Sequence, residues 1–420
     1  MKMRSMELSN YRCFKDFKIA FDEQLTVLVG VNGAGKTAAL DALGSFLKWL
    51  RYVGIGNRTS INLVPTDVAI NRKPEEITYQ FNVSSSGKSA SIDCLFGETS
   101  EGVINSSIAE SIEYRIEELL PLSKPILASY MAGRFVSENN FTLASNARAK
   151  NIYVDIENSF NRTLDYSSTL TWFDKADADE ARDMRDNGVK RKQPELVAVR
   201  EALSKALLGK YERPRMHGNP PELVIYESGT EQQYKVSQLS DGYRAMLALV
   251  MDLARRMAQA SVMITEPNES ILNKSAIVLI DEIELHLHPS WQQTVLTTLM
   301  DIFPNTQFIV TTHSPQVLTS IPNKHIRILS DGKSYTFEEQ SQGVDASLLL
   351  KRVFGVDARP GNLDIVKVLA EYSEMVYDGR WNTSEAEELR ERLNEHYGSD
   401  ELELSKLDLH IENKKWENSL

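Results

Sequence analysis

A glycine-rich loop between a strand and a helix constrains the fold of this chain more than any other segment. Leu25–Val29 is a continuous apolar run, typical of a strand buried on both faces of a parallel sheet. Gly30–Thr37 follows as GVNGAGKT and matches the phosphate-loop pattern GxxxxGKS/T. Leu40, Leu43 and Leu47 then recur at helical spacing. Strand, loop and helix in this order predict an α/β fold with a phosphate-binding loop.

The residue types in the loop suit a bound nucleotide. Glycines let backbone N–H groups turn inward around a phosphate, and the following helix adds its positive N-terminal dipole. Lys36 is expected to reach the β- and γ-phosphates, and Thr37 to place its hydroxyl on Mg²⁺. The candidate nucleotide-binding residues of this segment are Gly30, Asn32, Gly33, Ala34, Gly35, Lys36, Thr37 and Ala38.

Two further apolar runs also end in groups that suit a nucleotide site. Ala276–Ile280 is followed by Asp281, which would hold the Mg²⁺ shell, and by Glu282, which would act as general base toward water. Gln307–Thr311 leads shortly to His313. Ligands of parallel sheets gather beyond the carboxyl ends of the strands. We therefore expect the three strand ends to form one nucleotide site.

A fourth motif, Leu239–Arg244, precedes an amphipathic helix. Ser240 suits the N-cap, and Asp241 in the first turn favours the helix dipole. This capping role is one interpretation of the motif. The other, which is compatible with it, is that the helix N-terminus faces the γ-phosphate of a nucleotide bound by another subunit.

Two clusters allow a functional and a purely structural interpretation. Glu284–Pro289 contains two histidines beside carboxylates, which suggests zinc, but no further His or Cys cluster completes a site. We favour a loop at a subunit contact. The basic residues near position 187 would suit contact with nucleic acid. Asp183 and Asp186 lie among them and lower the local positive charge, so we favour a solvent-exposed face over a nucleic-acid site. These basic residues are Arg182, Arg185, Lys190, Arg191 and Lys192.

Composition limits the partners that the chain can bind and the cellular compartment that suits it. The chain has 47 Lys and Arg against 59 Asp and Glu, a formal charge of −12, so it is not a general nucleic-acid coat. Cys13 and Cys94 cannot build a disulfide scaffold, which favours a reducing cytoplasm. The apolar runs are far shorter than the roughly 18 residues that cross a bilayer, and no secretory signal is expected, so no membrane partner is predicted.

Four segments are predicted. Residues 1–103 form an N-terminal lobe with the phosphate loop, and residues 104–215 form an inserted, mostly helical region. Residues 216–343 form a C-terminal lobe with the other three motifs, and residues 344–420 form a helical interaction module.

Together, GVNGAGKT, LSDGYR, IVLIDE and TTHSP resemble the motifs of ATP-binding-cassette (ABC) ATPases, in the SMC, RecF and OLD-like branch rather than the transporter branch. The resemblance implies a P-loop NTPase of the α/β class, with an ABC-ATPase-like head, a mixed sheet with a mostly parallel core, and ATP with Mg²⁺ as ligands. It also implies that Ser240 and Gly242 act in trans, that Glu282 is the base and that His313 is the switch histidine. Two copies would then close head to head around ATP, as a dimer or a higher homo-oligomer.

Two weaker assignments follow from the same resemblance. Asn10–Phe14 is similar to the NFRxF segment of that branch, in which the arginine, here Arg12, helps to frame the nucleotide. Asp67 would take the position of the glutamine of transporters and contact the metal. Asp241 stands where transporters have glycine, which agrees with the branch.

IDEIELHLHPSWQQ, FIVTTHSPQVL and LSDGYRAMLALVMDLARR also resemble the small ATPases encoded beside HNH nucleases in bacterial defence pairs of the Septu and retron-associated type. VFGVDARP matches the same group less specifically. This resemblance implies a regulatory ATPase of an anti-phage complex that controls an HNH nuclease on a separate chain, with nucleic acid contacted through the complex. A RecF- or SMC-like DNA-repair ATPase is the alternative, and the helical insertion disfavours a transporter motor.

Overall fold

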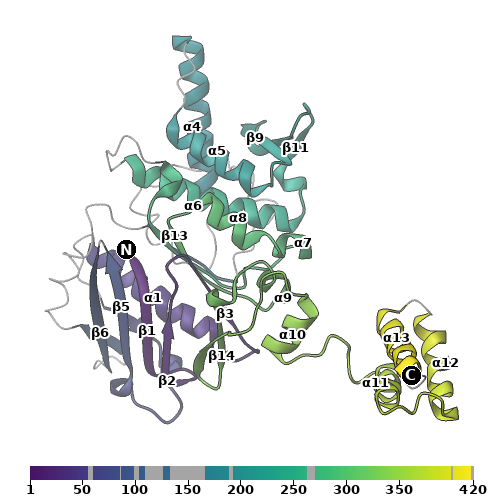
Figure 1. The fold of residues 1–420 in the computed structure, drawn as a ribbon. Coiled ribbons are helices and arrows are strands. Elements are labelled where there is room, and N and C mark those ends of the chain that lie inside the picture. The colour runs from purple at the N-terminus through teal and green to yellow at the C-terminus, as the bar shows by residue number, and fades with distance from the viewer. Residues whose placement is uncertain are drawn as a thin grey trace. The chain divides into compact units, whose positions relative to one another are not determined.

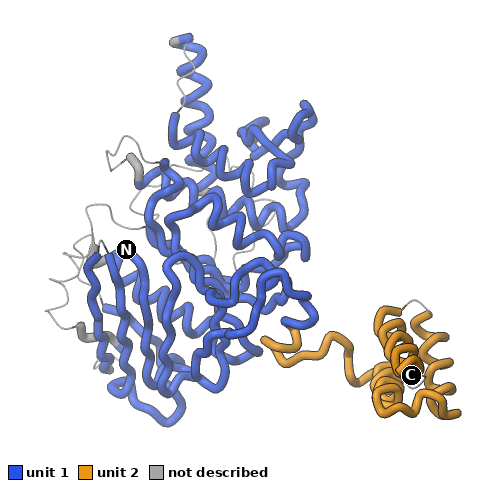
Figure 2. Tube along the Cα trace, in the orientation of Figure 1, with its two compact units in different colours: residues 1–349 blue, residues 350–420 orange. Residues whose placement is uncertain are grey.

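The computed structural model describes most of the chain in two compact units, residues 1–349 and 350–420 (Figure 2). The described residues are 1–54, 60–85, 87–98, 104–108, 126–132, 166–188, 193–262, 270–398 and 401–417. Lys190, Arg191 and Lys192 of the basic cluster lie outside these ranges.

A mixed sheet with a parallel core forms the centre of the first unit. Its strands lie in the order β15-β14-β3-β13-β12-β8, and only the β14–β15 pair is antiparallel. Every residue of β3, β8, β12 and β13 is buried, which explains their continuous apolar sequences. The predicted fold class is confirmed. The strands are β3 (Leu25–Val29), β8 (Ile126–Tyr130), β12 (Ala276–Ile280), β13 (Thr306–Thr311), β14 (Ile326–Ser330) and β15 (Lys333–Thr336).

An antiparallel sheet, in the order β2-β1-β5-β6-β7-β4, packs against helix α1 (Lys36–Gly54). The Phe46 ring stacks on Phe81 of β5 at 4.0 Å between centroids, whereas a Cβ on Gly44 would lie 3.9 Å from Leu279 of β12. Helix α1 therefore lies between the two sheets (Figure 1). The strands are β1 (Lys2–Tyr11), β2 (Phe14–Ala20), β4 (Asn62–Leu63), β5 (Thr78–Ser85), β6 (Lys88–Glu98) and β7 (Ile104–Ile108).

Helices and a small sheet, in the order β11-β10-β9, complete the first unit. The helices are α4 (Tyr166–Asn187), α5 (Pro194–Ala206), α6 (Asp241–Val262), α7 (Pro289–Gln292), α8 (Val295–Ile302) and α9 (Pro315–Leu318), with α10 (Ala346–Phe354) at the boundary between units. The strands are β9 (Tyr211–His217), β10 (Glu222–Glu227) and β11 (Gln233–Lys235). Strands β7 and β8 lie within the range 104–215, for which mostly helices are predicted, and β8 belongs to the central sheet.

The second unit packs three helices around its own apolar core. Helices α11 (Asp364–Tyr377), α12 (Ser384–Tyr397) and α13 (Leu402–Glu417) contribute side chains that include Tyr372, Leu393 and Leu407. Arg390 of α12 donates two hydrogen bonds to the Asp408 carboxylate of α13, at 2.6 and 2.7 Å. Among the described residues, no helix of either unit has the length and apolarity of a membrane span.

Asp252 of α6 is the centre of a buried polar network beside the central sheet. Its carboxylate accepts hydrogen bonds from Tyr130 of β8 at 2.8 Å, from Thr169 of α4 at 3.0 Å, and from Arg255 and Arg256 at 2.8 and 2.7 Å. Burial alone would raise the pKa of Asp252, but the two guanidiniums hold it well below its ordinary value. The network ties β8 and α4 to the helix that begins at Asp241.

We expect Asp252→Asn to destabilise the first unit by about 3–5 kcal/mol, because Arg255 and Arg256 lose a buried counterion. Urea unfolding of both proteins at pH 7 measures the difference. The Asp252 pKa is lowered in the folded state, so this stabilisation is present above a pH of about 4 and decreases as the pH falls below it. Asp179→Asn removes an exposed pair with Arg182 and is the matched control, with an expected loss under about 1 kcal/mol. Equal losses in the two variants would contradict the prediction.

Candidate nucleotide-binding site

The sheet order brings the three predicted strand ends together. Strand β13 lies between β3 and β12, with Thr311 in register with Leu28 and Val310 in register with Ile280. All three strands are parallel, so the residues that follow them emerge at one edge of the sheet. The phosphate loop, Asp281 with Glu282, and the segment that contains His313 are therefore neighbours.

The conformation of the phosphate loop explains its glycines. Gly35 has φ +93°, in the left-handed region, and a Cβ there would lie 2.5 Å from the Phe14 ring. At Gly30 a Cβ would lie 2.5 Å from the carbonyl oxygen of Leu329 in β14. Only glycine fits both positions without displacing a neighbour, so the loop packs closely on β2 and β14.

Lys36 is the first residue of α1, and its side chain folds back over the loop. Its Nζ donates to the carbonyl oxygens of Gly30 at 2.8 Å and of Val31 at 3.1 Å. Only 6% of Lys36 is exposed. Burial lowers the pKa of Lys36, although the nearby carboxylates, Asp281 foremost, partly oppose the shift. The ammonium is thus held against the segment whose backbone N–H groups suit a phosphate.

Thr37 and Asp281 form the pair that fits Mg²⁺. The Thr37 hydroxyl lies 3.2 Å from Oδ2 and 3.4 Å from Oδ1 of Asp281, across the gap between α1 and the end of β12. Thr37 is exposed and Asp281 is buried. A hydroxyl and a carboxylate oxygen are hard ligands of the kind Mg²⁺ prefers. This donor set fits the ion that the sequence predicts.

Thr311 contacts the turn that carries both carboxylates, and sequence reasoning did not single it out. Its hydroxyl donates to Asp281 Oδ1 at 2.6 Å and accepts from the Glu282 N–H at 2.7 Å. Its carbonyl accepts from the Ile283 N–H at 3.0 Å. The available signal was its place as the last residue of a buried strand and the first residue of the TTHSP motif.

Glu284, which follows the same turn, holds the segment of the predicted switch histidine. Its carboxylate accepts from the His313 backbone N–H at 2.6 Å and from the Thr312 hydroxyl at 2.7 Å. Farther along the loop, His288 caps α7 by accepting from the Ser290 N–H. In the described part of the chain, no group of three or more His, Cys, Asp or Glu side chains is placed to hold a metal ion.

Arg12 and Asp67 lie together at the start of α1. Arg12 donates to Asp67 Oδ1 and to Asp41 Oδ2, each at 2.7 Å, and Asp41 lies one helical turn after Thr37. Burial opposes the charge of Arg12, but Tyr11 and the two carboxylates raise the pKa of Arg12 overall. Asp67 Oδ2 accepts from the Val64 N–H at 2.9 Å. Both oxygens of Asp67 thus bind protein groups, and Asp281 rather than Asp67 is the carboxylate beside Thr37.

The LSDGYR motif is fixed against the loop that follows β12. Helix α6 begins at Asp241, and a Cβ on Gly242 would lie only 2.9 Å from the His286 carbonyl oxygen. The Tyr243 ring packs edge-on against Trp291 of α7, with 4.5 Å between centroids. Ser240 is exposed, and its carbonyl accepts from the Arg244 N–H at 3.1 Å. The exposed N-terminus of α6 therefore has a defined position beside the loop that follows β12.

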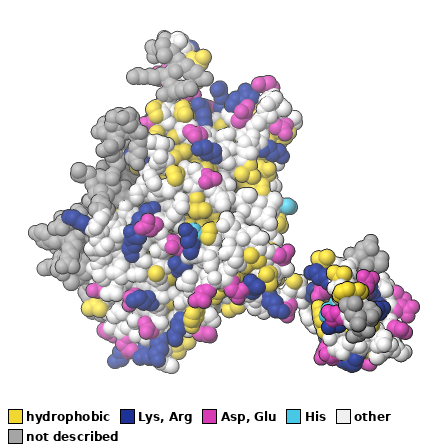
Figure 3. All heavy atoms as spheres, in the orientation of Figure 1, with side chains coloured by type: hydrophobic (Ala, Val, Ile, Leu, Met, Phe, Trp, Pro, Cys, Tyr) yellow, Lys and Arg dark blue, Asp and Glu magenta, His cyan; other side chains and the backbone are white. Residues whose placement is uncertain are grey.

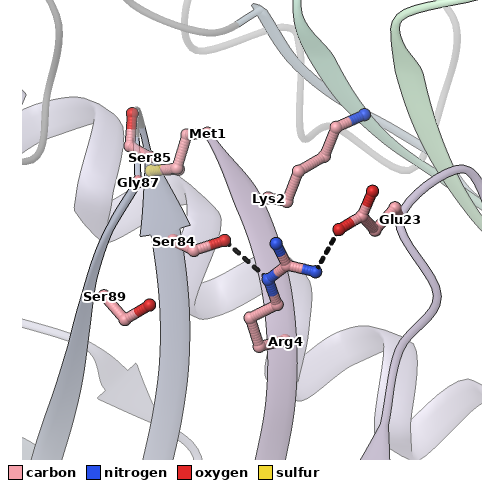
Figure 4. A pocket seen from close by; sticks show the side chains of 8 residues that line it. All are labelled: Met1, Lys2, Arg4, Glu23, Ser84, Ser85, Gly87 and Ser89. Carbon is pink, nitrogen blue, oxygen red and sulfur yellow. Dashed lines mark hydrogen bonds and ion pairs between the residues drawn. The ribbon is translucent and has the colours of Figure 1, made fainter.

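A separate pocket lies at the start of β1 and does not include any of the predicted site residues (Figure 4). Arg4 points toward Glu23 and Ser84, with hydrogen bonds of 2.7 and 2.6 Å. Lys2 donates to the Asn305 carbonyl at 3.0 Å. Both basic side chains of this pocket thus bind protein groups.

Comparisons with known proteins found similar families and one similar fold. A family described as "AAA ATPase domain" matches residues 1–161, and one described as "AAA domain, putative AbiEii toxin, Type IV TA system" matches residues 137–319. An SMC head domain from Thermotoga maritima covers 80% of this chain and 97% of its own, with 15% identity and a TM-score of 0.42.

Three relatives carry related names. The chain is 36% identical over 224 residues to "Retron Ec83 probable ATPase" of Escherichia coli, covering 53% of this chain and 40% of that protein. It is 26% identical to "Retron Vc95 probable ATPase" of Vibrio cholerae, over 94% of this chain and 88% of that protein. It is 21% identical to "Septu protein PtuA" of Bacillus thuringiensis, over 84% of each.

The predicted resemblance is confirmed by these matches: two AAA family descriptions together span residues 1–319, and two of the relatives are named as probable ATPases. The chain is thus similar to two retron ATPases and to the Septu protein PtuA. The match spans less than half of the Ec83 protein, so what that whole protein does is not transferred to this chain directly.

Proposed function

We propose that the chain binds ATP with Mg²⁺ at this site and hydrolyses it to ADP and phosphate. The observation that carries the proposal is that Lys36, the Thr37–Asp281 pair and Glu282 all follow parallel strands of one sheet, β3 and β12, at the same edge. A phosphate-binding cation, a metal-binding pair and a base are the three parts that phosphoryl transfer to water requires.

Each residue has a chemical role in this proposal. Lys36 binds the terminal phosphates, and Thr37 with Asp281 holds the metal, which when bound offsets charge on the phosphate oxygens. Glu282 accepts the proton of the attacking water. His313, whose backbone is held by Glu284, contacts the terminal phosphoryl group. Arg12, held by Asp41 and Asp67, frames the nucleotide from the side of β1.

The complete site also requires a second copy of the chain. Ser240 is exposed at the N-terminus of a helix of 22 residues, where the helix dipole favours an anion. In the proposed dimer, Ser240 and Gly242 of one copy face the terminal phosphate bound by Lys36 of the other. Two such sites form when two heads close around two ATP molecules.

Ser240→Ala is expected to lower kcat by about 10- to 100-fold, the effect of one lost hydrogen bond to a charged phosphate. Glu282→Gln lowers it as well, and mixing the two variants tests the trans arrangement. A mixed dimer contains one site with an intact Glu282 from one copy and an intact Ser240 from the other. Steady-state phosphate release should therefore recover on mixing, to at most half the wild-type rate. Absence of any recovery, when mixed dimers form, would contradict the trans arrangement.

We further propose that this ATPase is the regulatory subunit of an anti-phage defence complex and controls a separate HNH nuclease. Similarity to retron and Septu ATPases supports this role. Lys and Arg side chains on the face shown in Figure 3 are interspersed with Asp and Glu, which favours contact with nucleic acid through a partner over direct binding. The helical module of residues 344–420 is the proposed docking element for that partner. Residues 104–215 are the proposed insertion between the two lobes of the ATPase head.

Purification of the tagged protein from its own host, followed by mass spectrometry, tests the defence role. The expected result is recovery of an HNH nuclease in constant ratio to the ATPase. ATP-dependent binding of DNA by the isolated chain, without a recovered nuclease, would instead support the RecF-like alternative.

A further inference from the structure

We propose that Thr311 is a positioning residue that sets the geometry of both acidic groups of the site, Asp281 and Glu282. The inference rests on the proposed ATPase function and adds to it a residue that none of the four motifs assigns to the reaction. It is carried by the position of Thr311 at the end of β13, next to the turn that follows β12.

Three hydrogen bonds join Thr311 to three consecutive residues of that turn. The hydroxyl donates to Asp281 Oδ1 at 2.6 Å and accepts from the Glu282 N–H at 2.7 Å. The Thr311 carbonyl accepts from the Ile283 N–H at 3.0 Å. Thr311 is fully buried, so water does not compete for these bonds. A single hydroxyl group thus connects the metal-binding residue to the backbone of the base.

The backbone of Glu282 shows why such a connection is needed. Glu282 has φ +48°, in the left-handed region that L residues with a side chain rarely adopt. A strained conformation persists only where neighbouring groups fix it. The bonds from Thr311 to the N–H groups of Glu282 and Ile283 fix it from both sides. This conformation sets the direction in which the Glu282 side chain leaves the end of β12.

At Asp281 the same hydroxyl fixes the rotation of the carboxylate. Thr311 binds Oδ1, and Oδ2 is then the oxygen nearer to the Thr37 hydroxyl, at 3.2 Å against 3.4 Å for Oδ1. Oδ2 and Thr37 are the atoms that the proposed function assigns to the metal. Removing the Thr311 hydroxyl removes one of the bonds that fix this carboxylate and weakens its pairing with Thr37.

The chain offers a matched control on the same strand. Thr306 is the first residue of β13 and is fully buried, as Thr311 is. Its hydroxyl has no hydrogen-bond partner among the described residues. Thr306→Val therefore makes the same change of atoms in the same strand without removing a bond to the site.

The experiment compares Thr311→Val, Thr311→Ser and Thr306→Val with the wild type in the full-length protein. For Thr311→Val we expect kcat to fall by about 10- to 100-fold while the Kd for ATP without Mg²⁺ changes less than about threefold. The Mg²⁺ concentration for half-maximal rate should rise. Thr311→Ser, which keeps the hydroxyl, should restore most of kcat, and Thr306→Val should stay within about twofold of wild type.

The possible outcomes separate this inference from the proposed function. An active wild type with an equally active, folded Thr311→Val variant would overturn the role of Thr311 and leave the ATPase proposal standing. A wild type that does not hydrolyse ATP under any condition would overturn the ATPase proposal and this inference with it. If Thr311→Val does not fold, Thr311→Ala replaces it, and a rate equal to that of Thr311→Ser would overturn the inference.

Discussion

Glu282→Gln is expected to lower kcat for ATP hydrolysis by about 10²- to 10⁴-fold, the range that a positioned general base contributes. Glutamine has nearly the same shape but cannot accept a proton at neutral pH. The bond to Thr311 uses the backbone N–H of residue 282 and survives the change. ATP binding should therefore remain within about threefold of wild type, since Lys36, Thr37 and Asp281 keep their positions. Steady-state phosphate release and equilibrium binding of a fluorescent ATP analogue give the two values.

Glu338→Gln, an exposed glutamate outside the site, is the control for the loss of one negative charge and should leave kcat unchanged. With hydrolysis blocked, ATP should also remain between the proposed heads, so light scattering of Glu282→Gln should show a dimer that depends on ATP. A Glu282→Gln variant that hydrolyses ATP at the wild-type rate would show that another group accepts the proton.

The parts of this site that lie within single motifs were predictable from the sequence. The phosphate loop is such a part, because Gly30 and Gly35 make their close contacts through backbone geometry that only glycine permits. The ends of β12 and β13 were predictable for a second reason. Their apolar runs are typical of strands buried on both faces, and parallel strands place their carboxyl ends at one edge.

Contacts between motifs were not predictable in the same way. Thr311 and Glu284 each bind a segment that follows a different strand, and the choice of partner depends on β13 lying beside β12. Strand order does not follow from local periodicity. Strand β8 was missed because its five residues stand within a range of irregular helical signals, although they pair with β12 along its whole length.

Asp67 makes contacts that the sequence did not reveal. Its position ahead of the β5–β6 hairpin suggested a metal ligand, and the turn around it brings Arg12 and the Val64 N–H to its two oxygens. The backbone also links the two residues, through the Arg12 N–H and the Asp67 carbonyl at 2.8 Å. Arg12 is thereby positioned by two carboxylates, Asp67 and Asp41, and this arrangement supports its proposed role beside the nucleotide.

Lys36→Ala is expected to weaken ATP binding by at least about 100-fold, because a buried cation that contacts two phosphates makes charge-assisted hydrogen bonds of about 1.5–3 kcal/mol each. The stability of the nucleotide-free protein, in contrast to its ATP binding, should not fall in this variant. The pKa of Lys36 is lowered in the folded protein, chiefly by burial, so the charged form is less favourable there than in the unfolded chain at neutral pH. Removing the ammonium should therefore leave the melting temperature of the nucleotide-free protein unchanged or higher.

Lys48→Ala is the matched control, because Lys48 is an exposed lysine on the same helix and should affect neither quantity. Isothermal titration with ATP and Mg²⁺ and thermal melting without nucleotide measure the two effects on the three proteins. Binding by Lys36→Ala within about threefold of Lys48→Ala would remove Lys36 from the site. A large fall in its melting temperature would show that the two carbonyl contacts of Lys36 stabilise the fold. We expect weaker ATP binding without loss of stability. This pair of results follows only if the burial of Lys36 serves ligand binding and does not stabilise the fold.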